Sequence, residues 1–140
     1  MNGTLKSWLL EGDPAIRYHA MKLLFEDEQG ANVERHRTET HGWGKKLLDL
    51  QDKTTHQWTG IYSPKWISTH YTLMELKNLG ICPMCASFVK GVEVVVKALW
   101  PNKGRVNKYR HQDMCVVGML VSLMTYAQLN SPELEEMVDY

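Results

Sequence analysis

An internal repeat of about fifty residues is the feature that most constrains how this chain can fold. A shift of 47 positions superposes Leu73, Leu76 and Leu79 on Leu120, Leu123 and Tyr126. A shift of 53 positions superposes Tyr18, Ala20, Met21 and Leu23 on Tyr71, Leu73, Met74 and Leu76. The shorter shift also superposes the preceding segments, placing Leu47 and Leu48 on Val94 and Val95. The repeating unit is therefore expected to be a helical hairpin, present three times.

Helical periodicity runs through the whole sequence. Apolar residues recur with a period near 3.6, as Ile16, Ala20, Leu23 and Leu24 do along one stripe of the first expected helix. No segment alternates apolar and polar residues as a strand would. The composition, 44% hydrophobic and 23% charged, is typical of a globular chain. We expect a single all-α domain over residues 1–140, built as an array of antiparallel helical hairpins.

Capping residues and glycines set the expected helix boundaries. Asp13-Pro14 is a strong helix start, because Asp is a good N-cap and Pro fits the first helical position. Gly80 can end a helix in a left-handed conformation, and Gly42 and Gly44 weaken the second helix, which is expected either as one helix or as two with a kink. Helices are expected at residues 14–26, 32–51, 66–79, 84–99, 112–128 and from 131 onward, separated by connections that include an aromatic-rich loop at 52–64 and a basic segment at 102–110.

Charge and hydropathy exclude several classes of protein. Lys and Arg total 16 against 16 Asp and Glu, so no basic surplus is available to neutralise nucleic-acid phosphates. The longest nearly uncharged segment, residues 114–129, is shorter than the roughly 18–20 residues that span a bilayer. The first residues lack the pattern of a secretory signal, and the odd number of cysteines, three, fits a reducing compartment. We expect a cytoplasmic protein without a membrane span or nucleic-acid partner.

One segment resembles a known repeat. Gln57-Trp58, followed by the helical residues 66–73 and then by Leu79-Gly80, is similar to the glutamine-tryptophan type repeat of the terpene cyclase and protein prenyltransferase superfamily. Residues 115–120 resemble a later inner helix of squalene-cyclase-like bacterial proteins. The likeness extends over residues 13–129, and it implies half of an α/α toroid.

The resemblance implies an incomplete ring without a transferable activity. A toroid of this superfamily closes with about twice as many hairpins as this chain holds, so the chain is expected to be either a fragment or a half-ring that another polypeptide covers. The Asp-x-Asp-Asp motif with which squalene-hopene cyclases protonate an alkene is missing, as is the Asp, Cys and His zinc set of the protein prenyltransferases. Whether the chain is an enzyme stays open.

Trp58, Tyr62, Trp66 and His70 are the candidate ligand-binding residues. Because His70 follows Trp66 by one helical turn and the other two lie in the preceding loop, together they can form an aromatic wall with one titratable group. Asp113 is a candidate acid by analogy with the cyclases. In the structural alternative, the aromatic residues fix the loop to the core, His70 is merely hydrogen-bonded and Asp113 caps a helix.

Cys82, Cys85, His111 and Cys115 form two pairs with spacings that structural zinc sites use. His111 and Cys115, however, flank an apolar helix that would bury Cys115 as a small hydrophobic residue. Our first expectation is therefore no metal and no cofactor, with zinc at these four residues as the alternative.

Two functional hypotheses follow from the sequence. In the first, the chain is a non-catalytic interaction or structural module, and its hairpins bury their apolar faces against a second copy or another protein. In the second, it binds an isoprenoid or other apolar small molecule, or is a degenerate terpene-cyclase-like enzyme whose aromatic faces stabilise carbocations through cation–π attraction.

Overall fold

The computed structural model describes residues 3–140. Its helices are α1 (Gly3–Leu10), α2 (Pro14–Leu24), α3 (Glu28–Arg37), α4 (Gly42–Asp49), α5 (Thr69–Asn78), α6 (Ala86–Leu99), α7 (Met114–Tyr126) and α8 (Pro132–Val138). The strands β1 (Arg105–Asn107) and β2 (Arg110–His111) form one small antiparallel sheet. The all-α class is confirmed. Across the described residues, every helix is too short or too polar to cross a bilayer.

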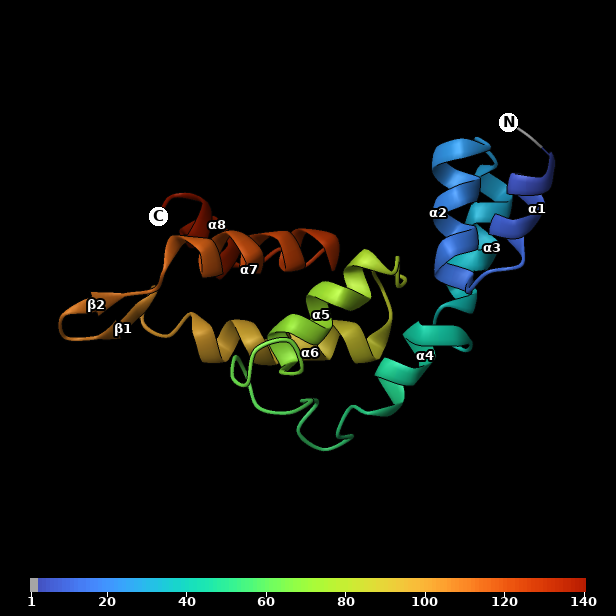
Figure 1. Cartoon of the computed structure of the whole chain (residues 1–140). Helices are drawn as coiled ribbons and strands as arrows, with labels where there is room; N and C mark the ends of the chain where they lie inside the picture. Colours follow the sequence, from blue (N-terminus) through green and yellow to red (C-terminus); the bar gives the residue numbers. More distant parts are fainter. Residues whose placement is uncertain (1–2) are drawn as a thin grey trace.

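The helices form an elongated, curved array (Figure 1). Helices α1, α2 and α3 lie together at one end, and α4 connects them to the stack of α5, α6 and α7. Helix α8 packs beside α7, and the hairpin β1–β2 projects at the end opposite α1. Different elements therefore form the two ends of the molecule.

The main core lies between α5, α6 and α7. Leu73 and Leu76 of α5 are fully buried, as are Leu120 and Leu123 of α7 and Phe88 of α6. The two leucine pairs are the positions that the 47-residue shift superposes, so the repeat places equivalent residues in one shared interior. Burial stabilises the fold by about 2 kcal/mol for each such side chain.

An arginine joins the N-terminal helices to this core. The Arg35 guanidinium of α3 lies 5.1 Å from the ring centroid of Tyr18 and 6.0 Å from that of Tyr126. Arg35 also donates a long hydrogen bond, 3.4 Å, to the Tyr126 hydroxyl, which itself donates to the Ile81 carbonyl. Tyr18 packs against Gly80, where a Cβ would overlap the ring. The predicted left-handed end at Gly80 is confirmed by its φ of +80°, and the close approach of Tyr18 also requires glycine there.

Asp13 caps two helices at once. One carboxylate oxygen accepts from the Ala15 N–H at 3.0 Å, at the start of α2, as the sequence predicts. The other accepts from the Trp43 N–H at 2.9 Å, at the start of α4. Gly42 makes this second contact possible, because its φ is +67° and a Cβ there would overlap the Asp13 carboxylate. A single side chain thus fixes how α4 leaves the N-terminal helices.

Several helix boundaries depart from the sequence expectation. Residues 32–51 belong to two helices, α3 and α4, which confirms the two-helix alternative. Helix α5 begins at Thr69 rather than Trp66, because Trp66 has a φ of +75°, outside the right-handed helical region. Helix α1 was not expected at all.

The apolar stripe expected on the helix at residues 14–26, which the structure has as α2, is only partly buried. Ala20 is buried, but Ile16 and Leu24 are 49% and 56% exposed. Helix α2 instead turns Ala15 and Tyr18 toward its neighbours, because the Asp13 cap and the Arg35 contact set its rotation. The periodicity was therefore correct for a helix but wrong for which face is inside.

The hairpin β1–β2 within the basic connection was also not expected. Its strands are three and two residues long, and every residue in them is exposed. Strands this short and polar carry no alternating apolar pattern, so the sequence contains no signal for them.

Because Asp13 caps two helices, we expect it to contribute more to the free energy of unfolding than an ordinary N-cap does. Replacing Asp27, which caps only Gly30 of α3, with Ala should lower the free energy of unfolding by about 1 kcal/mol. Asp13→Ala should lower it by about 2 kcal/mol, because the Trp43 N–H loses its acceptor as well. Urea denaturation followed by circular dichroism measures both. Equal losses in the two variants would contradict the double role.

Candidate functional site

Trp58 holds its loop against the core. Its indole N–H donates to the Leu47 carbonyl at 2.7 Å, and its backbone N–H donates to the Thr69 hydroxyl at 3.0 Å. The ring also reaches α6, where a Cβ on Gly91 would lie 3.1 Å from it. Trp58 therefore has the structural role that the sequence offered as the alternative to ligand binding.

Tyr62, His70 and Tyr71 form a ring cluster on the side of α5. The ring centroid of Tyr62 lies 5.3 Å from that of His70 and 5.4 Å from that of Tyr71. The Tyr71 hydroxyl donates to the Tyr62 hydroxyl at 3.1 Å. Hydrogen bonding to Tyr71, burial and nearby acidic groups including Cys115 and Asp113 raise the pKa of Tyr62 to about 12. The Tyr62 phenol is therefore protonated at neutral pH.

His70 is fully buried beneath these rings. Its Nε2 lies 3.4 Å from the Met119 sulfur of α7, and its Nδ1 has no hydrogen-bond partner among the described residues. Burial lowers the pKa of His70 below its ordinary value of 6.5, so the imidazole is neutral at pH 7. A neutral imidazole packed between α5 and α7 links the two inner helices.

Trp66 and Asp113 lie at the edge of this cluster. Trp66 is 78% exposed, and one side of its ring meets Tyr71 at a centroid distance of 5.2 Å. Asp113 is exposed and forms an ion pair with Arg110 at 2.8 Å. Of the five candidate residues, Tyr62 and His70 are therefore in contact, and Trp66 and Asp113 lie at the surface nearby. Trp58 instead attaches its loop to the core.

The candidate metal ligands are dispersed. Among residues 3–140, no three His, Cys, Asp or Glu side chains come together in a way that could hold a metal ion. Cys85 is buried at the start of α6, where burial raises its thiol pKa, and Cys115 is exposed at the start of α7. His111 lies in β2 with its ring stacked on Tyr140. The set Cys82, Cys85, His111 and Cys115 is not gathered into one site.

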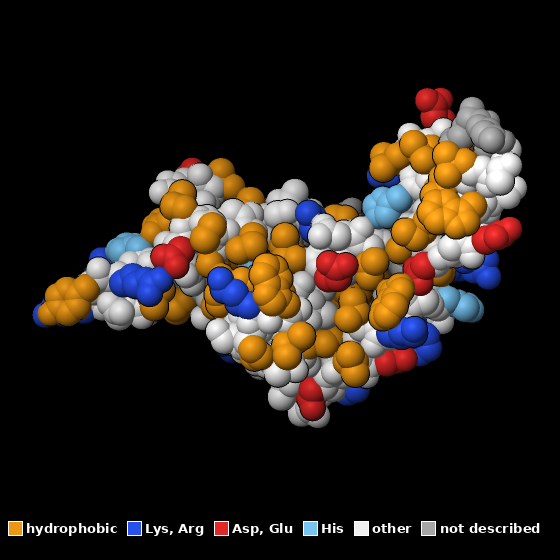
Figure 2. Space-filling view, in the orientation of Figure 1, with side chains coloured by type: hydrophobic (Ala, Val, Ile, Leu, Met, Phe, Trp, Pro, Cys, Tyr) orange, Lys and Arg blue, Asp and Glu red, His pale blue; other side chains and the backbone are white. Residues whose placement is uncertain are grey.

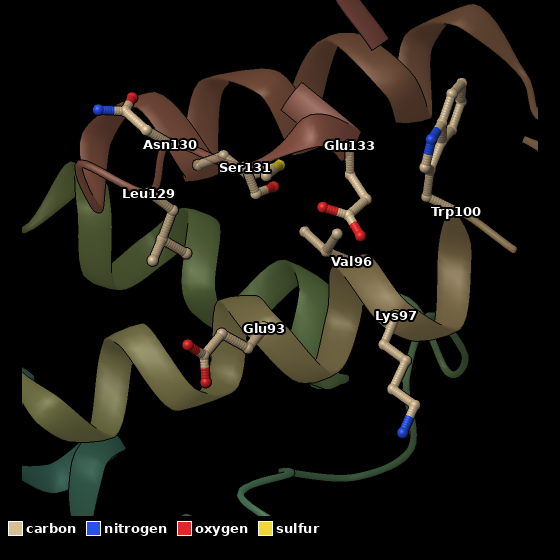
Figure 3. Close-up of a pocket in the computed structure, with 9 residues that line it drawn as sticks. Glu93, Val96, Lys97, Trp100, Leu129, Asn130, Ser131 and Glu133 are labelled. Atoms are coloured by element: carbon tan, nitrogen blue, oxygen red, sulfur yellow. The ribbon is translucent and has the colours of Figure 1, made fainter. Parts of the chain in front are cut away.

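A cavity of about 620 Å³ lies in a region that the sequence did not mark. Helix α6, the last turn of α7 and the start of α8 form its walls. Val96 and Met124, both almost completely buried, and Leu129 contribute to its lining, together with the exposed side chains of Glu93 and Glu133 (Figure 3). These lining residues come from separate segments of the chain, so the sequence alone could not group them.

A second hollow lies between α1 and α2. Trp8, Leu9, Gly12 and Ile16 line most of this groove of about 460 Å³. Figure 2 shows hydrophobic side chains gathered over the same end of the molecule. The sequence signal was present in Trp8-Leu9-Leu10, but no helix was assigned to it.

Comparison of this chain with protein-family models, curated proteins and solved structures finds no match to any of the three. The toroid resemblance therefore stays an expectation.

The buried His70 predicts an acid-sensitive stability. Because its pKa is lowered in the folded state, the unfolded chain binds a proton more readily, and the free energy of unfolding falls as the pH drops through 6.5. His70→Gln should flatten this dependence between pH 7 and 5, whatever it does to stability at pH 7. The matched control is His36→Gln, on the exposed side of α3. Urea unfolding at a series of pH values measures the slope, and an unchanged slope in His70→Gln would contradict the assignment.

Proposed function

We propose that this chain is a helical-hairpin interaction module that pairs with a second copy of itself through the end formed by α1 and α2. The observation that carries the proposal is the exposure of apolar side chains on α1. This helix has apolar residues at Leu5, Trp8, Leu9 and Leu10, yet Leu5 and Trp8 are exposed and the other two are only half-buried. A helix of eight residues is marginal in water by itself, and its stability has to come from packing of its apolar face.

The surface beside α1 has the form of a self-complementary interface. Trp8, 67% exposed, forms one wall of the groove, which Leu9, Glu11, Gly12 and Ile16 also line. In a twofold pair, the Trp8 indole of each copy can enter the groove of the other, and such isologous contacts are the commonest form of association between identical chains. The formal net charge is zero, so no long-range repulsion opposes the approach of two copies.

The toroid resemblance supports the same proposal. A half-ring of hairpins leaves apolar helix faces at its ends, which stacked repeats bury against a neighbour. The open end here includes Ile16 and Leu24 on α2, the residues of the expected stripe that the chain itself does not bury. Pairing would give these side chains the burial that their periodicity indicates.

Binding of an isoprenoid or other apolar ligand, or cyclase-like catalysis, at the aromatic cluster has less support. Tyr62, His70 and Tyr71 already occupy one another's faces, and Trp58 is engaged with Leu47. The cavities described above are lined by other residues. A ligand at the cluster would have to displace ring contacts that the fold already makes.

Sedimentation equilibrium tests the pairing. The expected mass is twice that of the 16.2 kDa chain. Trp8→Lys should weaken the dimer by at least about tenfold, because a charge would replace an anchor at the centre of the interface. Trp66→Lys is the matched control, since Trp66 is at least as exposed but lies on the loop before α5.

Two outcomes would overturn the proposal. One is a wild-type chain that stays monomeric at roughly millimolar concentration, at which even weak specific pairs associate. The other is a dimer that Trp66→Lys disrupts and Trp8→Lys leaves intact. Circular dichroism of each variant checks that its helices are retained.

A further inference from the structure

Cys82 and Cys85 stand at the two ends of one tight turn between α5 and α6. The Cys85 backbone N–H donates to the Cys82 carbonyl at 2.9 Å, which closes a four-residue β-turn with Pro83 and Met84 at its centre. The Cα atoms at the ends of such a turn lie less than about 7 Å apart. Disulfides join cysteines whose Cα atoms are about 4.4–6.8 Å apart, so rotation of the two side chains can bring these sulfurs into bonding distance.

The two thiols of the turn differ in exposure. Cys85 is 8% exposed and belongs to the main core, whereas Cys82 is only half-buried and the neighbouring Met84 is 67% exposed. Burial raises the pKa of the Cys85 thiol, and the charge of the nearby Glu39 adds to this shift. A reagent in solvent therefore reaches Cys82 first, and Cys85 is the thiol that stays protonated.

Cys115 cannot take the place of Cys85 as the partner of Cys82. The Ile81 carbonyl, next to Cys82 in the chain, accepts from the Tyr126 hydroxyl at the end of α7. Cys115 lies near the opposite end of α7, at a distance from Tyr126 of about 16 Å along the helix axis. Within residues 3–140, the cysteines of the turn belong to no cluster that could hold a metal ion. The two cysteines are therefore left to the chemistry of a dithiol.

We propose that Cys82 and Cys85 form a reversible disulfide by exchange with small-molecule disulfides. The Cys82 thiol loses its proton to water, and its thiolate attacks one sulfur of the small disulfide, breaking that S–S bond and expelling one thiolate. Cys85 then loses its proton, attacks the Cys82 sulfur and expels the second small thiolate. Two protein thiols are oxidised, one small disulfide is reduced to two thiols, and the two protons pass through water to the leaving thiolates.

The exposure of Cys82 also makes the bond reversible. A small thiolate can attack the Cys82 sulfur of the closed disulfide, which returns the Cys85 thiol to the core. Disulfides with an exposed sulfur are the labile ones, in contrast to the structural disulfides of secreted proteins. The pair therefore responds to the ratio of small thiol to small disulfide around the protein.

Equilibration with glutathione tests the exchange. Every sample carries Cys115→Ser, because the exposed Cys115 thiol can form bonds between copies. The protein is held in buffers with different ratios of reduced to oxidised glutathione, quenched with acid, alkylated and measured by mass spectrometry. In oxidising buffers the chain should lose two hydrogen atoms and take up no alkyl group. In an excess of reduced glutathione it should again take up two alkyl groups.

Single substitutions assign the two roles. In Cys85→Ser the reaction should stop at the mixed disulfide, seen as the mass of one glutathione added at Cys82. In Cys82→Ser this adduct should be at least about tenfold less abundant, because the remaining thiol is buried and buried cysteines are inert. Serine is close in size to cysteine, and circular dichroism checks that each variant is folded.

Any of three results contradicts the exchange. The first is a chain that keeps both thiols free when oxidised glutathione is in large excess. The second is a disulfide that an excess of reduced glutathione does not open, and the third is an equal yield of adduct in the two single variants. Pairing through α1 involves neither cysteine, so either proposal can fail while the other stands.

Discussion

The fold depends on the burial of α5 and α7 against each other. Leu73 and Leu76 face Leu120 and Leu123 in a core from which water is excluded, and the His70 ring reaches the Met119 sulfur across the same interface. Neither helix can be placed in water without losing several kcal/mol of burial energy. Helix α6 packs on both members of this pair and α8 packs on α7, and a hollow lies between α6, the end of α7 and the start of α8. The N-terminal helices are attached from outside, through Arg35 and the Tyr18 and Tyr126 rings.

How much the sequence predicts depends on whether a feature is periodic. Three features were predicted from a periodic pattern or a helix-ending residue in the sequence, and the structure has each of them. They are the helical class, the shared interior of α5 and α7, and the left-handed glycine at the end of α5. The orientation of α2 could not be predicted, since it is set by the Asp13 carboxylate reaching Trp43, thirty residues away in the chain. The start of α5 was missed because the backbone of Trp66 takes a positive φ, which no side-chain pattern indicates for a tryptophan.

The candidate site was also predictable only in part. The loop aromatics were expected near His70, so the contact between Tyr62 and His70 was within reach of the sequence. The helical spacing that linked His70 to Trp66 was wrong, because α5 begins only at Thr69. The roles of the individual rings were not, because they depend on where hydrogen-bond partners lie, such as the Leu47 carbonyl for Trp58. The hollow between α6 and the start of α8 had no signal in the sequence. Its lining residues, among them Glu93, Met124 and Glu133, come from three helices that are separate in the sequence.

The surface proposed for pairing lies at one end of an elongated molecule, and the α5–α7 stack lies beyond α4 (Figure 1). The Arg35 guanidinium joins the two parts, because it lies 5.1 Å from the Tyr18 ring centroid and 6.0 Å from that of Tyr126. A second copy bound at α1 and α2 would therefore reach the core only through these contacts. The core leucines of α5 and α7 pack within one chain, so pairing through α1 should leave their packing unchanged.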